Sequence, residues 1–90
     1  MGHMFITASK SVRGGSLHLT SFILTPLNDT TISAHMTLYN ATAATDGKQI
    51  IFVRCNTANI SSVSWNGNDG VRLDNLYVTI SGGVTTIAWN

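Results

Sequence analysis

Short runs of β-forming residues, separated by glycine-containing turns, constrain the fold of this chain more than any other feature. Apolar and polar residues alternate in runs such as Leu17–Ser21 and Leu76–Ile80, and a period of two is typical of half-buried strands. Gly-Gly, Asn-Gly or Asp-Gly pairs lie between the runs, at residues 14–15, 46–47, 66–67, 69–70 and 82–83. The pattern predicts a small all-β domain.

We expect seven or eight short strands, at about residues 5–12, 16–25, 31–40, 48–55, 60–65, 71–73, 76–81 and 84–89. Gly14-Gly15 suits a tight hairpin or a bulge, and Pro26 should end a strand because it cannot donate to a ladder. Residues 66–70 are expected to form a polar loop, and Gly82-Gly83 to close a hairpin. Short antiparallel strands with regular turns are typical of a β-sandwich or jelly roll.

A chain of 90 residues has room for one domain. Residues 1–3 resemble a cloning scar, so we assign the single domain to residues 4–90. No apolar run reaches the roughly 18 residues that span a bilayer, and no signal peptide is visible. The sequence therefore predicts no membrane partner.

Charged residues are scarce, at 10% of the chain with a net charge of +1, against about 25% in average domains. The five cations are scattered along the sequence: Lys10, Arg13, Lys48, Arg54 and Arg72. A nucleic-acid binder normally clusters its cations, because neutralised phosphates supply the affinity. We therefore expect no nucleic-acid partner.

No constellation of residues predicts catalysis, a metal or a cofactor. The four carboxylates are all Asp and lie in turn contexts, where Asp usually bonds its own backbone. His18 and His35 have no metal-ligand spacing, and no nucleophile or phosphate-loop motif is present. Cys55, the only cysteine, excludes an internal disulfide and is expected to be a small buried side chain.

Two segments are apolar on both faces and would oversupply one small core: Phe22–Leu24 and Ile50–Val53. With few charges to protect strand edges, a monomer of this kind risks edge pairing. A closed homo-oligomer would bury the additional apolar faces. The candidate interface side chains are Phe22, Leu24, Ile51 and Val53.

A ligand-binding module is the alternative hypothesis. Trp65 lies beside the polar segment Asn66–Gly70, and aromatic faces can stack on sugars or bases. A glycan or a small nucleotide-type molecule would then contact Trp65, Asn68 and Arg72, with Arg54 as a further cation.

Three segments carry a family resemblance: Gly15-Ser16-Leu17, residues 37–43 (TLYNATA) before Asp46-Gly47, and residues 70–80 (GVRLDNLYVTI) before the closing Gly-Gly. The chain resembles small β proteins encoded by phages and prophages, of the capsid cement or decoration, head-fibre or tail-associated type. The resemblance implies a non-catalytic homo-oligomer, with a trimer favoured, that binds other virion proteins. It also implies synthesis in the host cytoplasm and a final location in the virion.

Overall fold

The computed structural model describes residues 2–26, 34–55 and 63–90, with the backbone alone for residues 63–69. Its strands are β1 (Gly2–Ile6), β2 (Lys10–Pro26), β3 (Ala34–Tyr39), β4 (Gln49–Cys55), β5 (Val63–Ser81) and β6 (Gly83–Trp89). All pairings are antiparallel, in one six-stranded sheet with the order β1-β6-β2-β5-β3-β4. The prediction of a small all-β domain is confirmed.

The strands are fewer and longer than the turn signals predicted. β2 has 17 residues and β5 has 19, because residues 14–15 and 66–70 lie inside strands instead of ending them. The register of β2 against β5 shifts between the Gly14–Asn75 and Leu17–Leu73 pairs. Gly14-Gly15 therefore marks a bulge and not a hairpin. β2 ends at Pro26, as expected.

The predicted hairpin at Gly82-Gly83 is wrong. The chain does turn there, but β5 pairs with β2 and β3, whereas β6 pairs with β1 and β2. The turn therefore carries the chain from one part of the sheet to another. Gly2 and His3, which the sequence interpretation set apart from the domain, lie in β1 opposite Trp89 and Ala88.

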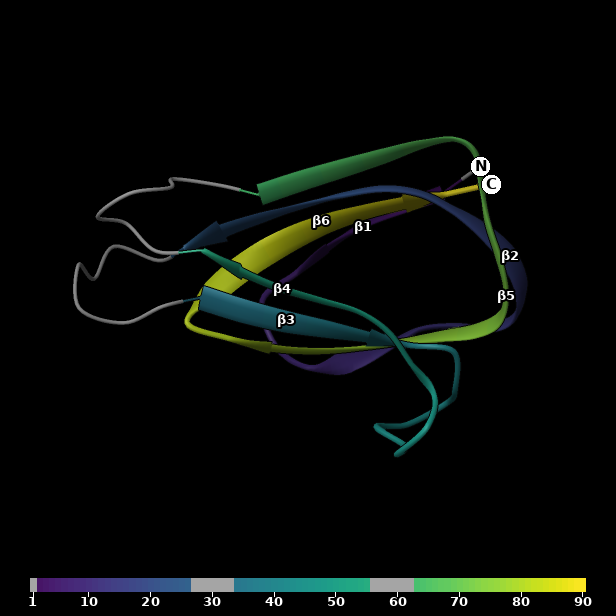
Figure 1. Ribbon diagram of the computed structural model, residues 1–90, viewed down its shortest axis with the longest axis horizontal. Coiled ribbons are helices and arrows are strands. Elements are labelled where there is room, and N and C mark those ends of the chain that lie inside the picture. The colour runs from purple at the N-terminus through teal and green to yellow at the C-terminus, as the bar shows by residue number, and fades with distance from the viewer. Residues whose placement is uncertain (1, 27–33, 56–62) are drawn as a thin grey trace.

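The sheet folds over on itself because its two longest strands bend together. Residues 19–26 of β2 pair with β6, while residues 77–81 of β5 pair with β3. Figure 1 shows β2 and β5 running along one layer, turning at the same end of the molecule, and returning along the other. The first layer holds β1, β6 and the C-terminal half of β2; the second holds β3, β4 and the C-terminal half of β5.

An uneven bulge lies at this bend. Between the pairs Leu19–Val71 and Ser21–Asn66, β2 contributes one residue and β5 contributes four. Bulges increase local twist and bend the strand that carries them. The segment predicted as a polar loop is therefore largely this bulge in β5, and Gly70 in it has a φ of +81°.

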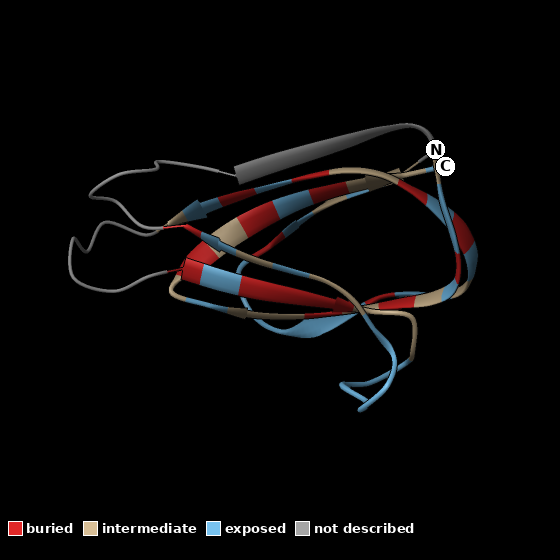
Figure 2. Ribbon diagram, in the orientation of Figure 1, coloured by how far each residue is buried: buried red, intermediate tan, exposed pale blue. Residues whose placement is uncertain are grey.

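The bulge also changes which side chains of β2 face the core. Leu17 and Leu19 point inward before it, and Phe22 and Leu24 point inward after it. A shift of one residue reverses the two faces of a strand, so the two apolar sets join one core. That core lies between the layers, where buried and exposed positions alternate along the strands (Figure 2). It comprises Ile6, Val12, Leu17, Leu19, Phe22, Leu24, Ala34, Met36, Leu38, Cys55, Leu73, Leu76, Val78 and Ile87.

Candidate interaction surfaces

Phe22 and Leu24 fill the core of a single chain, where both are almost fully buried. This corrects the expectation that they lie at an interface between copies. The surface position in this segment belongs to Ile23, which is 48% exposed. An unbroken period of two would place Ile23 on the face of Leu17 and Leu19, but the irregularity between Leu19 and Ser21 reverses the faces of the strand.

Ile51 and Val53 of β4 are not buried to the same extent, so their place at an interface between copies stays a prediction. They are half-buried, pack against the core, and lie opposite Leu38 and Met36 of β3. Phe52, between them, faces outward with 55% of its surface exposed. In each segment, the residue between the two candidate interface side chains is the more exposed one. Ile23 and Phe52 are therefore the side chains that an external partner could cover.

The proposed ligand contacts are only partly visible. Arg72 is exposed on β5 opposite His18, at the bend of the sheet. The side chains of Trp65 and Asn68 lie outside the described part of the structure, so contact with a ligand there stays a prediction. Arg54 lies on β4, in the second layer, with its guanidinium carbon 5.7 Å from the ring centroid of Phe52.

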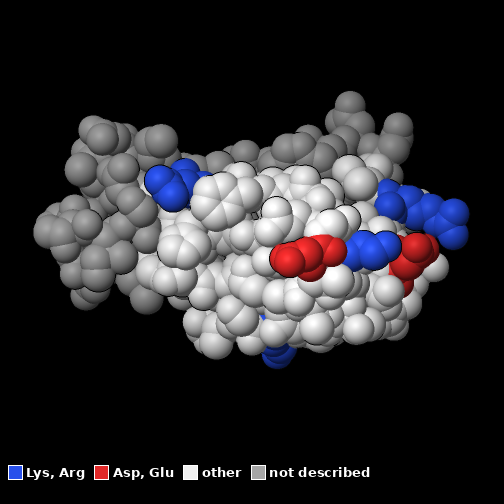
Figure 3. Space-filling view, turned by 60° about the horizontal axis from the view of Figure 1, so that its bottom comes forward, with Lys and Arg blue, Asp and Glu red and all other residues white. Residues whose placement is uncertain are grey.

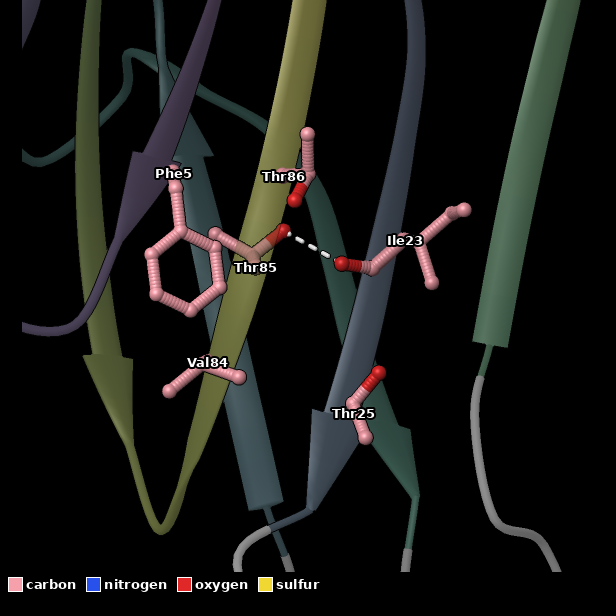
Figure 4. Close-up of a pocket in the computed structure, with 6 residues that line it drawn as sticks. All are labelled: Phe5, Ile23, Thr25, Val84, Thr85 and Thr86. Carbon is pink, nitrogen blue, oxygen red and sulfur yellow. Dashed lines mark hydrogen bonds between the residues drawn. The ribbon is translucent and has the colours of Figure 1, made fainter.

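A shallow hollow lies on the outer face of the first layer (Figure 4). We use "the hollow" for the site lined by Phe5, Ile23, Thr25, Val84, Thr85 and Thr86. Thr86 lies in register with both Phe5 and Ile23, which places three strands in one row. The hollow has a volume of about 80 Å³ and no charged lining residue, whereas pockets for small ligands enclose about 300 Å³ or more.

Strand pairing and one buried hydroxyl fix the walls of the hollow. Thr85 is 1% exposed, and its hydroxyl donates a 2.7 Å hydrogen bond to the backbone carbonyl of Ile23. This bond links β6 to β2 at the backbone of Ile23, whose side chain lines the hollow. Phe5, on β1, is 62% exposed and stands at the opposite wall.

Phe52 projects from the outer face of the second layer, near the imidazole of His35 and the guanidinium of Arg54. The imidazole of His35 lies 6.2 Å from the Phe52 ring centroid at an interplanar angle of 37°, and Arg54 lies on the ring. Farther along β3, the rings of Tyr39 and Tyr77 meet edge to face at 6.4 Å. Figure 3 shows a face on which the charged groups gather mainly toward one end.

The thiol of Cys55 is buried beside the backbone of β2. Cys55 is 2% exposed, and its Sγ lies 3.7 Å from the carbonyl oxygen of Leu24, to which it donates. Burial raises the pKa of the Cys55 thiol, which disfavours the nucleophilic thiolate. The prediction of a small buried side chain is confirmed.

Among the side chains that the structure describes, at residues 2–26, 34–55 and 70–90, no three His, Cys, Asp or Glu gather as metal ligands would. In the same part of the chain, no helix has the length and apolar character to cross a bilayer.

Comparisons with protein-family models, with curated proteins and with solved structures found no match to this chain. Interpretation of function therefore rests on the two outer faces, the hollow on one and Phe52 on the other.

Proposed function

We propose that this protein is a non-catalytic structural module of a bacteriophage particle, a homo-oligomeric β domain that binds other virion proteins. One observation carries the proposal: each outer face presents a large apolar side chain that is about half exposed. Ile23 is 48% exposed on the first layer and Phe52 is 55% exposed on the second. The placement in a virion rests on the sequence resemblance.

The hollow has the composition of a protein-binding surface. The centres of protein interfaces are depleted of charged residues and enriched in aromatic ones, and the hollow combines Phe5 with aliphatic and threonine side chains. Removing such apolar surface from water stabilises a complex by about 25 cal/mol per Å². Its small volume favours contact with a side chain of another protein over a whole ligand.

The same surfaces support the proposed oligomer. A second copy would cover apolar area that the 90-residue chain leaves in contact with water. The resemblance favours three copies, and a closed ring of identical copies leaves no such patch unmatched.

Purified virions test the proposal. Particles from an infected or induced host culture would be separated on a density gradient, digested and analysed by quantitative mass spectrometry. We expect peptides of this chain at a fixed ratio to the major capsid or tail protein. Particles that lack the chain, in a lysate that contains it, would overturn the proposed function.

A further inference from the structure

Two Asp-Gly pairs of this chain have the same chemistry in different settings. Asp46-Gly47 lies between β3 and β4, whereas Asp69-Gly70 lies within β5. Both glycines have a φ of +81°, so neither the residue types nor that backbone angle distinguishes the pairs. Their surroundings differ, and the surroundings decide which pair can react.

Asp46-Gly47 occupies an exposed turn. The backbone amide of Lys48 donates a 3.1 Å hydrogen bond to the carbonyl oxygen of Thr45, which makes Asp46 and Gly47 the two central residues of the turn. Asp46 has no positive φ, and Gly47 at +81° completes the pattern of a type II turn. Both residues are exposed, and a Cβ at Gly47 would meet no atom within 4 Å.

The amide of Gly47 takes no part in the hydrogen bonding of this turn. The turn uses the amide of Lys48 and the carbonyl of Thr45, and the carbonyl of Lys48 accepts a 2.9 Å bond from the amide of Asn40. Among the residues that the structure describes, none accepts a hydrogen bond from the Gly47 N–H. The nitrogen next to the Asp46 side chain is therefore accessible, and few contacts hold the backbone around it.

We propose that Asp46 converts spontaneously to isoaspartate, which makes the aged chain a substrate for an enzyme that methylates isoaspartyl carboxylates. This inference does not depend on the proposed function. In the first step the Gly47 nitrogen bonds to Cγ of Asp46 and a Cγ–O bond breaks. The oxygen leaves as water, together with the amide proton and the carboxyl proton, and the product is a succinimide ring.

Water then opens the ring by one of two routes. Addition at Cγ restores aspartate, whereas addition at the main-chain carbonyl carbon of Asp46 breaks its bond to the Gly47 nitrogen. The second route leaves the chain running through the side-chain carbons and frees the α-carboxylate. One water leaves and one is consumed, so the mass of the chain is unchanged and no oxidant or reductant takes part. Glycine favours the reaction because it has no Cβ to hinder the approach of its nitrogen.

Asp69-Gly70 is protected by its place in the sheet. Its backbone belongs to β5, and a Cβ at Gly70 would lie 2.8 Å from the Cβ of His18 and 3.1 Å from the carbonyl oxygen of Leu19. Ring closure rotates the peptide unit between the two residues of the pair, which would separate β5 from β2 at the bend. Local opening of a paired strand costs free energy, so this pair should react far more slowly.

Isoaspartate at residue 46 should leave the domain folded. The change adds a side-chain carbon to the main chain within a segment, residues 42–49, that is exposed throughout. None of the buried core residues lies between Asn40 and Gln49. The modified chain can therefore accumulate without loss of the core packing.

The two pairs serve as test and control in one chain. The full chain would be incubated for several weeks near neutral pH, either folded or in concentrated guanidinium chloride, and digested with trypsin, which separates the pairs because Lys48 and Arg54 lie between them. Electron-transfer fragmentation locates isoaspartate in each peptide. Methylation by protein L-isoaspartyl methyltransferase with labelled S-adenosylmethionine measures its amount. In the folded chain we expect at least about tenfold more isoaspartate at residue 46 than at residue 69, and in guanidinium chloride similar amounts at both.

Asp46→Glu is the matched variant, because it keeps the charge but needs a larger ring that forms far more slowly. It should remove most of the methylation of the folded chain and leave isoaspartate at residue 69 in guanidinium chloride unchanged. Circular dichroism would show that the variant is folded. Isoaspartate at residue 46 that is absent from the folded chain, or no more abundant there than at residue 69, would overturn the proposal. The presence of the chain in virions is a separate result that this experiment leaves unaffected.

Discussion

A Cβ atom at Gly70 would lie 2.8 Å from the Cβ of His18 and 3.1 Å from the carbonyl oxygen of Leu19. The bulged part of β5 therefore approaches β2 more closely than a side chain would permit. With a φ of +81°, Gly70 also has a backbone conformation that other residues rarely adopt. The bend that brings the two layers together depends on this position.

Gly70→Ala should lower the free energy of unfolding by about 2–4 kcal/mol, since backbone strain of about 1–2 kcal/mol adds to overpacking. Gly47→Ala is the matched control, because Gly47 has the same φ of +81° but no atom within 4 Å of an added Cβ. Its loss should be about 1 kcal/mol. Urea unfolding measures both, and equal losses would show that the close approach to His18 contributes nothing.

Asn40 joins the end of β3 to β5. Its side-chain oxygen accepts hydrogen bonds from the backbone amides of Asp74, at 3.0 Å, and Asn75, at 3.2 Å. Asn40→Ala should cost about 1–2 kcal/mol of stability, because two backbone donors lose their partner. The exposed Thr42→Ala should stay within about 0.5 kcal/mol. A loss for Asn40→Ala as small as that of the control would remove this role.

Burial raises the pKa of the Cys55 thiol above its ordinary value of 9.0. Since the folded state binds this proton more tightly than the unfolded state, the contribution to stability is complete below pH 9 and falls as pH rises toward the folded pKa. The difference in unfolding free energy between the unaltered protein and Cys55→Ala should therefore shrink above pH 9. A difference that stays constant from pH 7 to pH 10 would contradict a buried thiol.

Sequence reasoning found the class of the fold because its signal is local. Alternation in Leu76–Ile80 and the lack of a ladder donor at Pro26 both act within a few residues, and both are confirmed. The buried Cys55 was also predictable, since it ends the largely apolar run Ile50–Arg54 and the sequence contains no Cys–His signature.

The remaining features depend on contacts between distant residues. Glycine pairs at a hairpin, a bulge and a crossing turn look alike in sequence. The sequence therefore does not decide between a hairpin and a bulge at Gly14-Gly15, and it wrongly indicates a hairpin at Gly82-Gly83. The extra residue at Thr20 reverses the faces of β2 and decides that Ile23, and not Phe22 or Leu24, faces outward. That reversal is set by pairing with β5 and β6, and no local pattern contains it.

The proposed function includes association of copies of the chain. The most direct measurement is the mass of the unaltered full chain by light scattering over a concentration series that reaches tens of micromolar. We expect a mass of several chains, with three chains of 9.6 kDa favoured, and dissociation on dilution. A mass of 9.6 kDa at every concentration would contradict the account.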